Sequence, residues 1–216
     1  MTGTKKNILI TALRLFAVNG YDAVSVSQIA GELGMTKGAL YKHYKNKRDI
    51  FDSIFEYVCQ LDVERSKQAG VPEKEFSEMP ESFCKTSPNS LKEYMIAQFY
   101  YWSGDEIACN FRKMLTLEQY KTEQMGELYQ KVMADGPLCF IEDLFREMTR
   151  DNANFFGKHR EMAVEFFAPF PLLLSICDMK KEKAEKEQIA KLYIQCMDNF
   201  FERYDLWNKE RQEENE

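Results

Sequence analysis

A short basic segment, MTKGALYKHYKNKRDIF at residues 35–51, stands out in a chain that is acidic overall. The 216 residues carry 29 Lys and Arg against 35 Asp and Glu, a net charge of −6, whereas residues 1–48 carry eight basic and two acidic residues. Ammonium groups and tyrosine hydroxyls both bind phosphate oxygens. This uneven distribution therefore indicates an N-terminal region that meets a polyanion.

The basic segment lies in a pattern of two short helices. The spacing of apolar residues predicts helices over about 26–33 and 36–43, separated by Gly34. Ser25 and Thr36 are residue types that accept backbone N–H bonds at a helix start. Two short helices joined by a tight turn form a helix-turn-helix, whose second helix enters the major groove of DNA.

The second helix would present a basic arc to the groove. At 100° per residue, Lys37, Gly38, Tyr41 and Lys42 span roughly 140° of its circumference. Lys37, near the helix start, is placed to reach a base edge such as guanine O6/N7. Gly38 lets the backbone approach closely, and the Tyr41 hydroxyl can bind a phosphate. Lys47 begins the next helix, where backbone N–H groups also favour an anion.

The stretch ILITALRLFAVNGYDAVSVSQIAGELGMTKGALYKHYKNKRDIF resembles the DNA-binding domain of the TetR family of bacterial transcription regulators. The matching features are A-x-x-L-F, N-G-Y-x-x-x-S-V, I-A-x-x-L-G, K-G-A-L-Y-x-H-Y and N-K, over about residues 5–58. The resemblance implies that Tyr41, His43 and Lys47 contact phosphate and that Lys37 reads bases. For His43, geometry alone leaves a structural role equally open. The predicted DNA-binding residues are Ser25, Thr36, Lys37, Gly38, Tyr41, Lys42, His43 and Lys47.

The rest of the chain also carries helical spacing, and strand signals are nearly absent. A Pro-rich and Ser-rich stretch at 68–90 is interpreted as a linker or long loop. Further helices are expected over about 91–102, 105–120, 123–134, 137–150, 158–178 (interrupted by Pro169 and Pro171) and 182–208. The predicted class is all-α, with a three-helix DNA-binding domain at 1–48 and a larger helical effector-binding and dimerisation domain at 49–216.

The larger domain is predicted to bind a small molecule and to form a homodimer. The last two long helices, about 158–178 and 182–208, are the candidate dimer interface, unless their apolar faces pack only within the chain. Large side chains of the middle helices could line an effector cavity or could only form a core. Arg112 is the candidate contact for an anionic effector. The candidate ligand-binding residues are Phe99, Trp102, Phe111, Arg112, Tyr120 and Phe145.

Other site chemistries lack a sequence signal. The six Cys are far apart and only two His are present, so neither a zinc site nor another metal or cofactor is expected. Motifs of nucleophilic, phosphate-binding or metal-dependent enzymes are missing. No signal peptide or apolar run long enough to span a membrane is apparent, which favours a cytoplasmic protein.

These observations predict a ligand-responsive, dimeric DNA-binding regulator, released as a repressor from a palindromic operator when a small molecule binds. The main alternative is a dimeric DNA-binding regulator controlled by a protein partner. A buried cavity would favour the first, and a solid core with an exposed apolar groove the second. An all-helical enzyme with an incidental basic end would require ionisable groups converging in a cleft.

Overall fold

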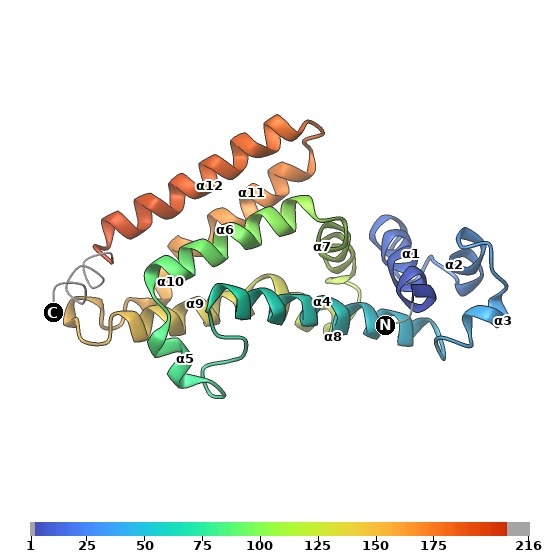
Figure 1. Cartoon of the computed structure of the whole chain (residues 1–216), viewed down its shortest axis with the longest axis horizontal. Helices are drawn as coiled ribbons and strands as arrows, with labels where there is room; N and C mark the ends of the chain where they lie inside the picture. The colour runs from blue at the N-terminus through green and yellow to red at the C-terminus, as the bar shows by residue number, and fades with distance from the viewer. Residues whose placement is uncertain (1–2, 207–216) are drawn as a thin grey trace. The chain divides into compact units, whose positions relative to one another are not determined.

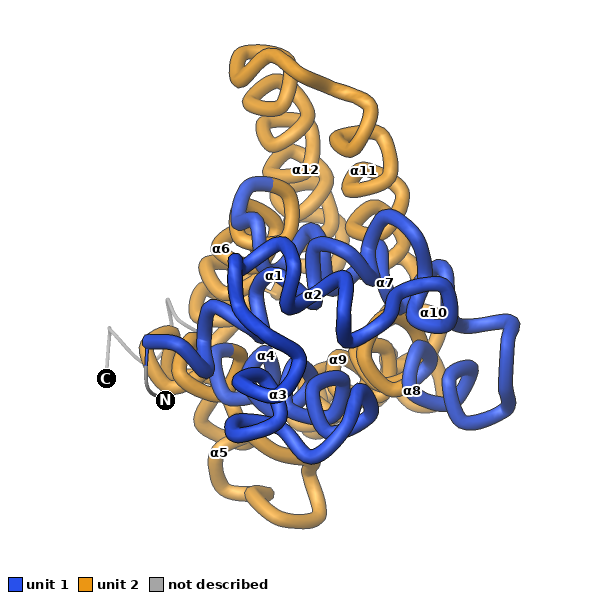
Figure 2. The backbone as a smooth tube through the Cα atoms, turned by 90° about the vertical axis from the view of Figure 1, so that its right-hand side faces the viewer, with its two compact units in different colours: residues 1–61, 104–130 blue, residues 62–103, 131–216 orange. Residues whose placement is uncertain are grey.

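The computed structural model describes residues 3–206, and every regular element in that range is helical, as the all-α prediction requires (Figure 1). Two compact units form: residues 1–61 with 104–130 make unit 1, and residues 62–103 with 131–216 make unit 2 (Figure 2). The predicted functional boundary after residue 48 is a different division of the chain and stays a prediction. No helix among the described residues is long and apolar enough to cross a membrane.

Unit 1 contains the predicted helix-turn-helix and packs it against a further helix. α1 contacts both α2 and α7, and the buried side chains of Leu9, Leu13 and Phe16 lie on one side of α1, at the i, i+4, i+7 spacing of a helix. The elements are α1 (Gly3–Asn19), α2 (Val26–Glu32), α3 (Lys37–Leu40), the first part of α4 (Lys47–Ala69), α7 (Glu106–Glu118) and most of α8 (Glu123–Met133).

The predicted helix starts are confirmed by their caps. Ser25 Oγ accepts the N–H of Gln28 at 3.2 Å while Gln28 Oε1 accepts the N–H of Ser25 at 2.7 Å, which is a complete capping box. The side chains of Thr36 and Asn46 each accept the backbone N–H three residues on, at 3.1 and 2.8 Å. Local side-chain chemistry therefore sets where α2, α3 and α4 begin.

The predicted end of the second short helix was wrong. α3 ends at Leu40 and not at residue 43, and the chain continues as a tight turn in which the carbonyl of Leu40 accepts the N–H of His43 at 2.9 Å. Tyr44, 1 % exposed, packs inward and donates its hydroxyl to the carbonyl of Lys5 at 3.0 Å. This long-range contact accompanies the tightened backbone, and helical periodicity alone does not contain it.

Unit 2 contains the second part of α4 and the helices that follow in two chain segments. Its further elements are α5 (Pro80–Lys85), α6 (Pro88–Gly104), α9 (Asp135–Met148), the 3-10 helix η1 (Ala153–Phe155), α10 (His159–Phe167), α11 (Pro169–Asp178) and α12 (Lys183–Arg203). The predicted Pro-interrupted helix is two helices, because Pro169 begins α11. The end of the predicted last helix, beyond 206, lies outside the described residues.

The stretch 68–90 is more ordered than a linker. It contains α5, which Pro80 begins, and the fully buried Phe83 ring lies between Phe76 at 5.4 Å and Phe140 at 5.3 Å. The interpretation of the whole stretch as a loop was therefore wrong for residues 80–85, and also at its two ends, where residues 68–69 belong to α4 and residues 88–90 to α6. A six-residue helix gains its stability from such burial rather than from its own propensity.

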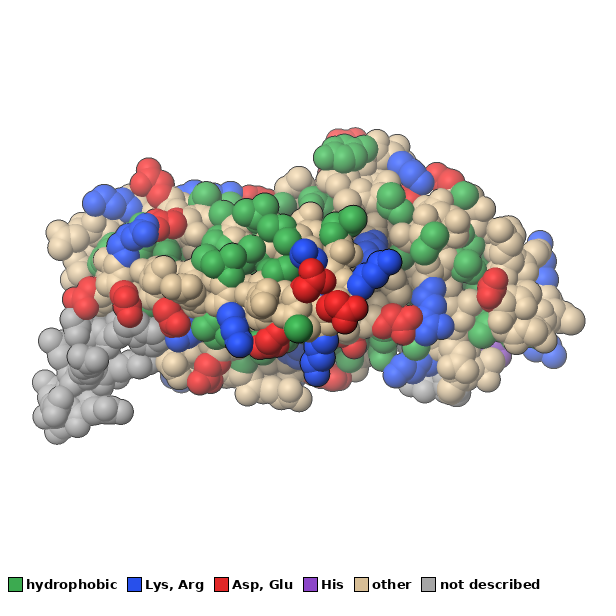
Figure 3. All heavy atoms as spheres, turned by 90° about the horizontal axis from the view of Figure 1, so that it is seen from above, with side chains coloured by type: hydrophobic (Ala, Val, Ile, Leu, Met, Phe, Trp, Pro, Cys, Tyr) green, Lys and Arg blue, Asp and Glu red, His purple; other side chains and the backbone are tan. Residues whose placement is uncertain are grey.

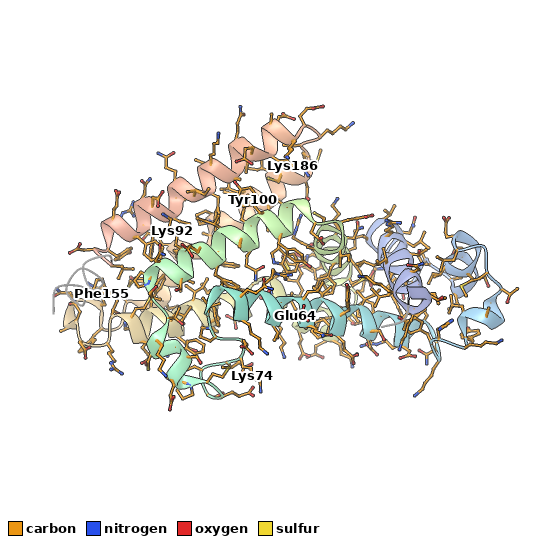
Figure 4. All side chains as sticks on the ribbon, viewed as in Figure 1. Glu64, Lys74, Lys92, Tyr100, Phe155 and Lys186 are labelled. Carbon is orange, nitrogen blue, oxygen red and sulfur yellow. The ribbon has the colours of Figure 1, made fainter. Side chains whose placement is uncertain are left out.

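Aromatic rings and polar contacts hold unit 2 together. Phe145 packs on Phe166 at 5.3 Å and on Phe200 at 5.2 Å, which joins α9, α10 and α12. Along α6 and α12, the Tyr100 hydroxyl donates to Glu187 at 3.0 Å and Lys186 donates to the carbonyl of Ser103 at 3.2 Å (Figure 4). The unit has a packed aromatic core with polar contacts at its rim.

Gly20 gives a test of the turn that follows α1. Its φ is +79°, and a Cβ there would lie 2.9 Å from Lys121 Nζ. We expect Gly20→Ala to lower the free energy of unfolding by about 1–2 kcal/mol, because L residues are strained at this φ. Chemical denaturation measures the change. Gly31→Ala, inside α2 where a Cβ meets open space, should instead stabilise by about 0.5–1 kcal/mol; a loss of equal size in both variants would contradict the assignment.

Candidate nucleic-acid interface

All eight residues predicted to bind DNA lie in unit 1, from the start of α2 to the start of α4. His43 and Lys47 are partly buried, and the other six are exposed: Ser25, Thr36, Lys37, Gly38, Tyr41 and Lys42. The hydroxyls of Ser25 and Thr36 are used as helix caps. Their side chains position the short helices, whichever further contacts they make.

The outward side of α3 and its following turn is basic. Lys37 Nζ lies 5.8 Å from the ring centroid of Tyr41, which is 43 % exposed, while Leu40 on the inner side is fully buried. A Cβ at Gly38 would meet nothing within 4 Å, so the backbone there is open to a close approach. Residues 33–48 contain no Asp or Glu. This segment therefore offers cationic and hydroxyl donors and no carboxylate of its own, while the carboxylate of Asp49, just beyond it, accepts the N–H of Lys45 at 2.7 Å.

Lys47 is used differently from the other lysines of this surface. Its ammonium donates to the carbonyls of Tyr21 at 2.8 Å, Asp22 at 3.3 Å and Val24 at 2.9 Å, and lies 4.2 Å from the centroid of the Tyr21 ring. An ammonium has three N–H donors, and all three point into the protein. Lys47 thus joins the start of α4 to the turn at residues 20–24, and its predicted phosphate contact would require exchanging these bonds.

Sequence reasoning missed this role of Lys47. Its partners are backbone carbonyls 23 to 26 residues earlier in the chain. Every residue has such a carbonyl, so the sequence does not show which of them accept a hydrogen bond from Lys47. The signal that was available, Lys47 at a helix start beside a basic segment, indicates a phosphate contact just as well.

The structure does not gather the six candidate ligand-binding residues within one unit. Phe99, Trp102 and Phe145 belong to unit 2, and Phe111, Arg112 and Tyr120 to unit 1. Five of them are buried: Phe99, Trp102, Phe111, Arg112 and Phe145. Tyr120 is 89 % exposed, because it follows the end of α7 in a turn. Its prediction as a lining residue of an interior cavity does not fit this position.

Two of the buried aromatic candidates have partners typical of a core. The Phe99 ring stacks on Tyr193 with centroids 4.6 Å apart and meets Phe170 at 5.9 Å. Phe145 stacks on Phe200 in the cluster described above. These contacts support the alternative weighed from the sequence, in which the aromatic residues form packing surfaces.

A polar cluster that the sequence analysis did not identify lies between α4 and α6 in unit 2. Gln98 is 4 % exposed, and its Nε2 donates to Asp62 and to the Tyr94 hydroxyl, both at 2.6 Å. The Arg65 guanidinium lies 3.4 Å from the centroid of the Tyr101 ring. Burial raises the pKa of Tyr94 to about 12, so its hydroxyl stays protonated at neutral pH. The i, i+4 spacing of Tyr94 and Gln98 could have indicated a shared polar face.

This cluster is incompletely satisfied. Among the described residues, the buried Oε1 of Gln98 and Nε of Arg65 have no hydrogen-bond partner. Buried polar atoms without partners are uncommon in native proteins, since each costs part of its lost hydration. One acceptor and one donor are therefore available to a water or to a bound molecule.

The role of Lys47 can be tested by stability. Lys47→Met keeps the length of the apolar stem and removes the ammonium donor from three carbonyls of the turn, of which that of Tyr21 keeps the N–H of Val24 at 3.4 Å. We expect the free energy of unfolding to fall by about 2 kcal/mol. Lys45→Met, which removes the same charge from an exposed side chain, serves as the control and should change it by less than about 0.5 kcal/mol. Equal stability of the two variants in urea unfolding would refute the role of Lys47.

Comparison with known proteins shows what the region of the short helices is similar to. Residues 8–54 match the model of bacterial regulatory proteins of the tetR family. The uncharacterized HTH-type transcriptional regulator YerO of Bacillus subtilis is 38 % identical over 80 residues, which are 35 % of this chain and 28 % of YerO. The HTH-type transcriptional regulator QacR of Staphylococcus aureus is 30 % identical over 131 residues, 59 % of this chain and 62 % of QacR.

Solved structures extend the likeness in fold over nearly the whole chain. The SmeT–triclosan complex has a TM-score of 0.65 at 20 % identity, covering 94 % of this chain and 91 % of SmeT. The sequence matches themselves span about a quarter to three fifths of the curated relatives' lengths. The match over residues 8–54 and the capped helix-turn-helix found there show that this part of the chain is the N-terminal domain of bacterial regulatory proteins of the tetR family.

Proposed function

We propose that the chain is a transcription regulator that binds duplex DNA through α3 and the turn that follows it. The observation that carries the proposal is the exposed basic surface of residues 36–43, which follows a fully capped α2 and contains no acidic residue. The family consists of transcription regulators and not of enzymes. In this proposal residues 1–48 act on DNA, and residues 49–216 bind an effector and form a dimer.

The proposed contacts divide into base reading and phosphate binding. Lys37, at the start of α3, reaches a base edge, and Gly38 allows the helix backbone to lie close to the groove wall. Tyr41, Lys42 and His43 bind phosphates and so fix the register of the helix on the duplex. Serine and threonine caps at residues 25 and 36 keep the two short helices in place.

We propose a homodimer formed through α10, α11 and α12. Four large apolar side chains of these helices remain between 42 and 62 % exposed: Val164, Leu172, Ile176 and Leu192. Apolar side chains also gather among charged ones on the face shown in Figure 3. A two-fold axis through such a face would present two copies of α3 to a palindromic operator.

We further propose that a small molecule releases the protein from its operator. SmeT, whose fold is similar, is known in complex with triclosan. The unsatisfied polar atoms of Gln98 and Arg65 are two groups in unit 2 that a polar effector would satisfy. Linkage requires that such an effector weaken DNA binding by the same factor by which DNA weakens effector binding.

The DNA-binding proposal is tested by selecting duplexes from a random library and measuring their affinity at several salt concentrations. Phosphate contacts release counterions, so the logarithm of affinity should fall linearly with the logarithm of salt concentration. Lys42→Ala should weaken binding to every duplex and reduce this slope by about one unit per protomer. No binding of any duplex even in dilute salt would overturn the proposal.

Lys37→Ala should act on sequence preference. We expect it to lose about 1–3 kcal/mol against the best selected site and to relax preference at one base pair in each half-site, because a base-edge contact disappears. Competition between the best site and its single-base variants measures the effect. If all sequences lost affinity equally, Lys37 would be a phosphate contact.

A further inference from the structure

Unit 1 contains a buried carboxylate that neither the family match nor the proposed DNA contacts use. Glu118, the last residue of α7, is 3 % exposed. Its Oε1 accepts the backbone N–H of Tyr21 at 2.8 Å and an N–H of Lys121 at 2.8 Å. Lys121 also lies 3.8 Å from the Asp22 carboxylate. Burying a carboxylate costs free energy unless it is paired and hydrogen-bonded, and Glu118 meets both conditions.

The partner of Glu118 is the turn at residues 20–24, which joins α1 to α2. Tyr21 in this turn is held at both of its backbone polar groups: its N–H by Glu118 from α7, and its carbonyl by Lys47 from α4. Its ring packs between Phe16 at 5.2 Å and Phe51 at 5.3 Å. Because Gly20 has a left-handed backbone, the turn does not continue α1. Within the turn the Tyr21 carbonyl accepts only a long bond from the N–H of Val24 at 3.4 Å, and the shorter bonds to the carbonyl and the N–H of Tyr21 come from α4 and α7.

The turn leads directly into the proposed DNA-reading helices. Ser25 caps α2 immediately after it, and α2 packs on α3. A displacement of Tyr21 would therefore be transmitted to both short helices. We propose that Glu118 is a positioning residue for DNA recognition, which fixes the orientation of α2 and α3 through the N–H of Tyr21. This inference rests on the proposed DNA-binding function.

The positioning role and a purely electrostatic role of Glu118 predict opposite changes in DNA affinity. Replacing Glu118 by a neutral residue removes a negative charge from the unit that would approach DNA, and long-range electrostatics then predicts tighter binding. A positioning role predicts weaker binding. Because Glu118 neutralises no phosphate, its replacement should leave the number of released counterions unchanged. The slope of the logarithm of affinity against the logarithm of salt concentration should therefore also stay the same.

The test uses the full chain and a duplex selected with the wild-type protein. Glu118→Met removes the acceptor, Glu118→Gln keeps a neutral oxygen acceptor, and Glu123→Gln removes the same charge from an exposed residue of unit 1. We expect Glu118→Met to lose affinity on the order of tenfold with an unchanged salt slope, since a hydrogen bond to a charged group is lost. Glu118→Gln should lie between Glu118→Met and the wild type, and Glu123→Gln should bind as tightly as the wild type or tighter.

A second measurement does not depend on DNA. Hydrogen exchange of the Tyr21 amide, followed by NMR, should be faster in both Glu118 variants than in Glu123→Gln, in proportion to their loss of affinity. If Glu118→Met does not fold, the comparison of Glu118→Gln with Glu123→Gln still decides, because both lose one charge.

Equal or tighter binding by the Glu118 variants, or an unchanged Tyr21 amide, would overturn the positioning role while leaving the DNA-binding function in place. A wild-type protein that binds no duplex would instead remove the function on which this role depends.

Discussion

Backbone groups that no helix can satisfy constrain unit 1 most strongly. The turn between α1 and α2 contains N–H and carbonyl groups that must be paired when they are removed from water. Two charged side chains pair them, Lys47 from the start of α4 and Glu118 from the end of α7. Both charged side chains thus hold the backbone of the turn through hydrogen bonds. The position of this turn determines where the short helices of the proposed DNA-binding surface lie.

The parts of the fold that sequence could predict are those governed by neighbouring residues. The caps at Ser25 and Thr36 act over three residues, and their types identify them directly. The end of α3 and the existence of α5 depend instead on the burial of Tyr44 and Phe83 against residues far along the chain. Periodicity reports which face is apolar, but it does not report which partner covers that face.

In the candidate site, too, the sequence predicts what neighbouring residues determine and does not predict what distant packing partners determine. Exposure of Lys37 follows from helical phase, which the residue order fixes, and Tyr41 and Lys42 are exposed as that phase predicts although they lie in the turn after α3. The bonds of Lys47 to carbonyls and the exposed position of Tyr120 follow from packing and from where α7 ends. Residue type alone left the large aromatic side chains between a cavity and a core, because a buried ring serves both equally well.

An acidic residue in a DNA-binding unit is unfavourable only if its charge is felt by the phosphates. Glu118 is buried, and its charge is offset by Lys121 at 2.8 Å, so most of its field is cancelled locally. What remains is a strong acceptor for one backbone N–H. A carboxylate can therefore support recognition of a polyanion when its role is to hold the backbone behind the basic surface and it takes no part in the contact itself.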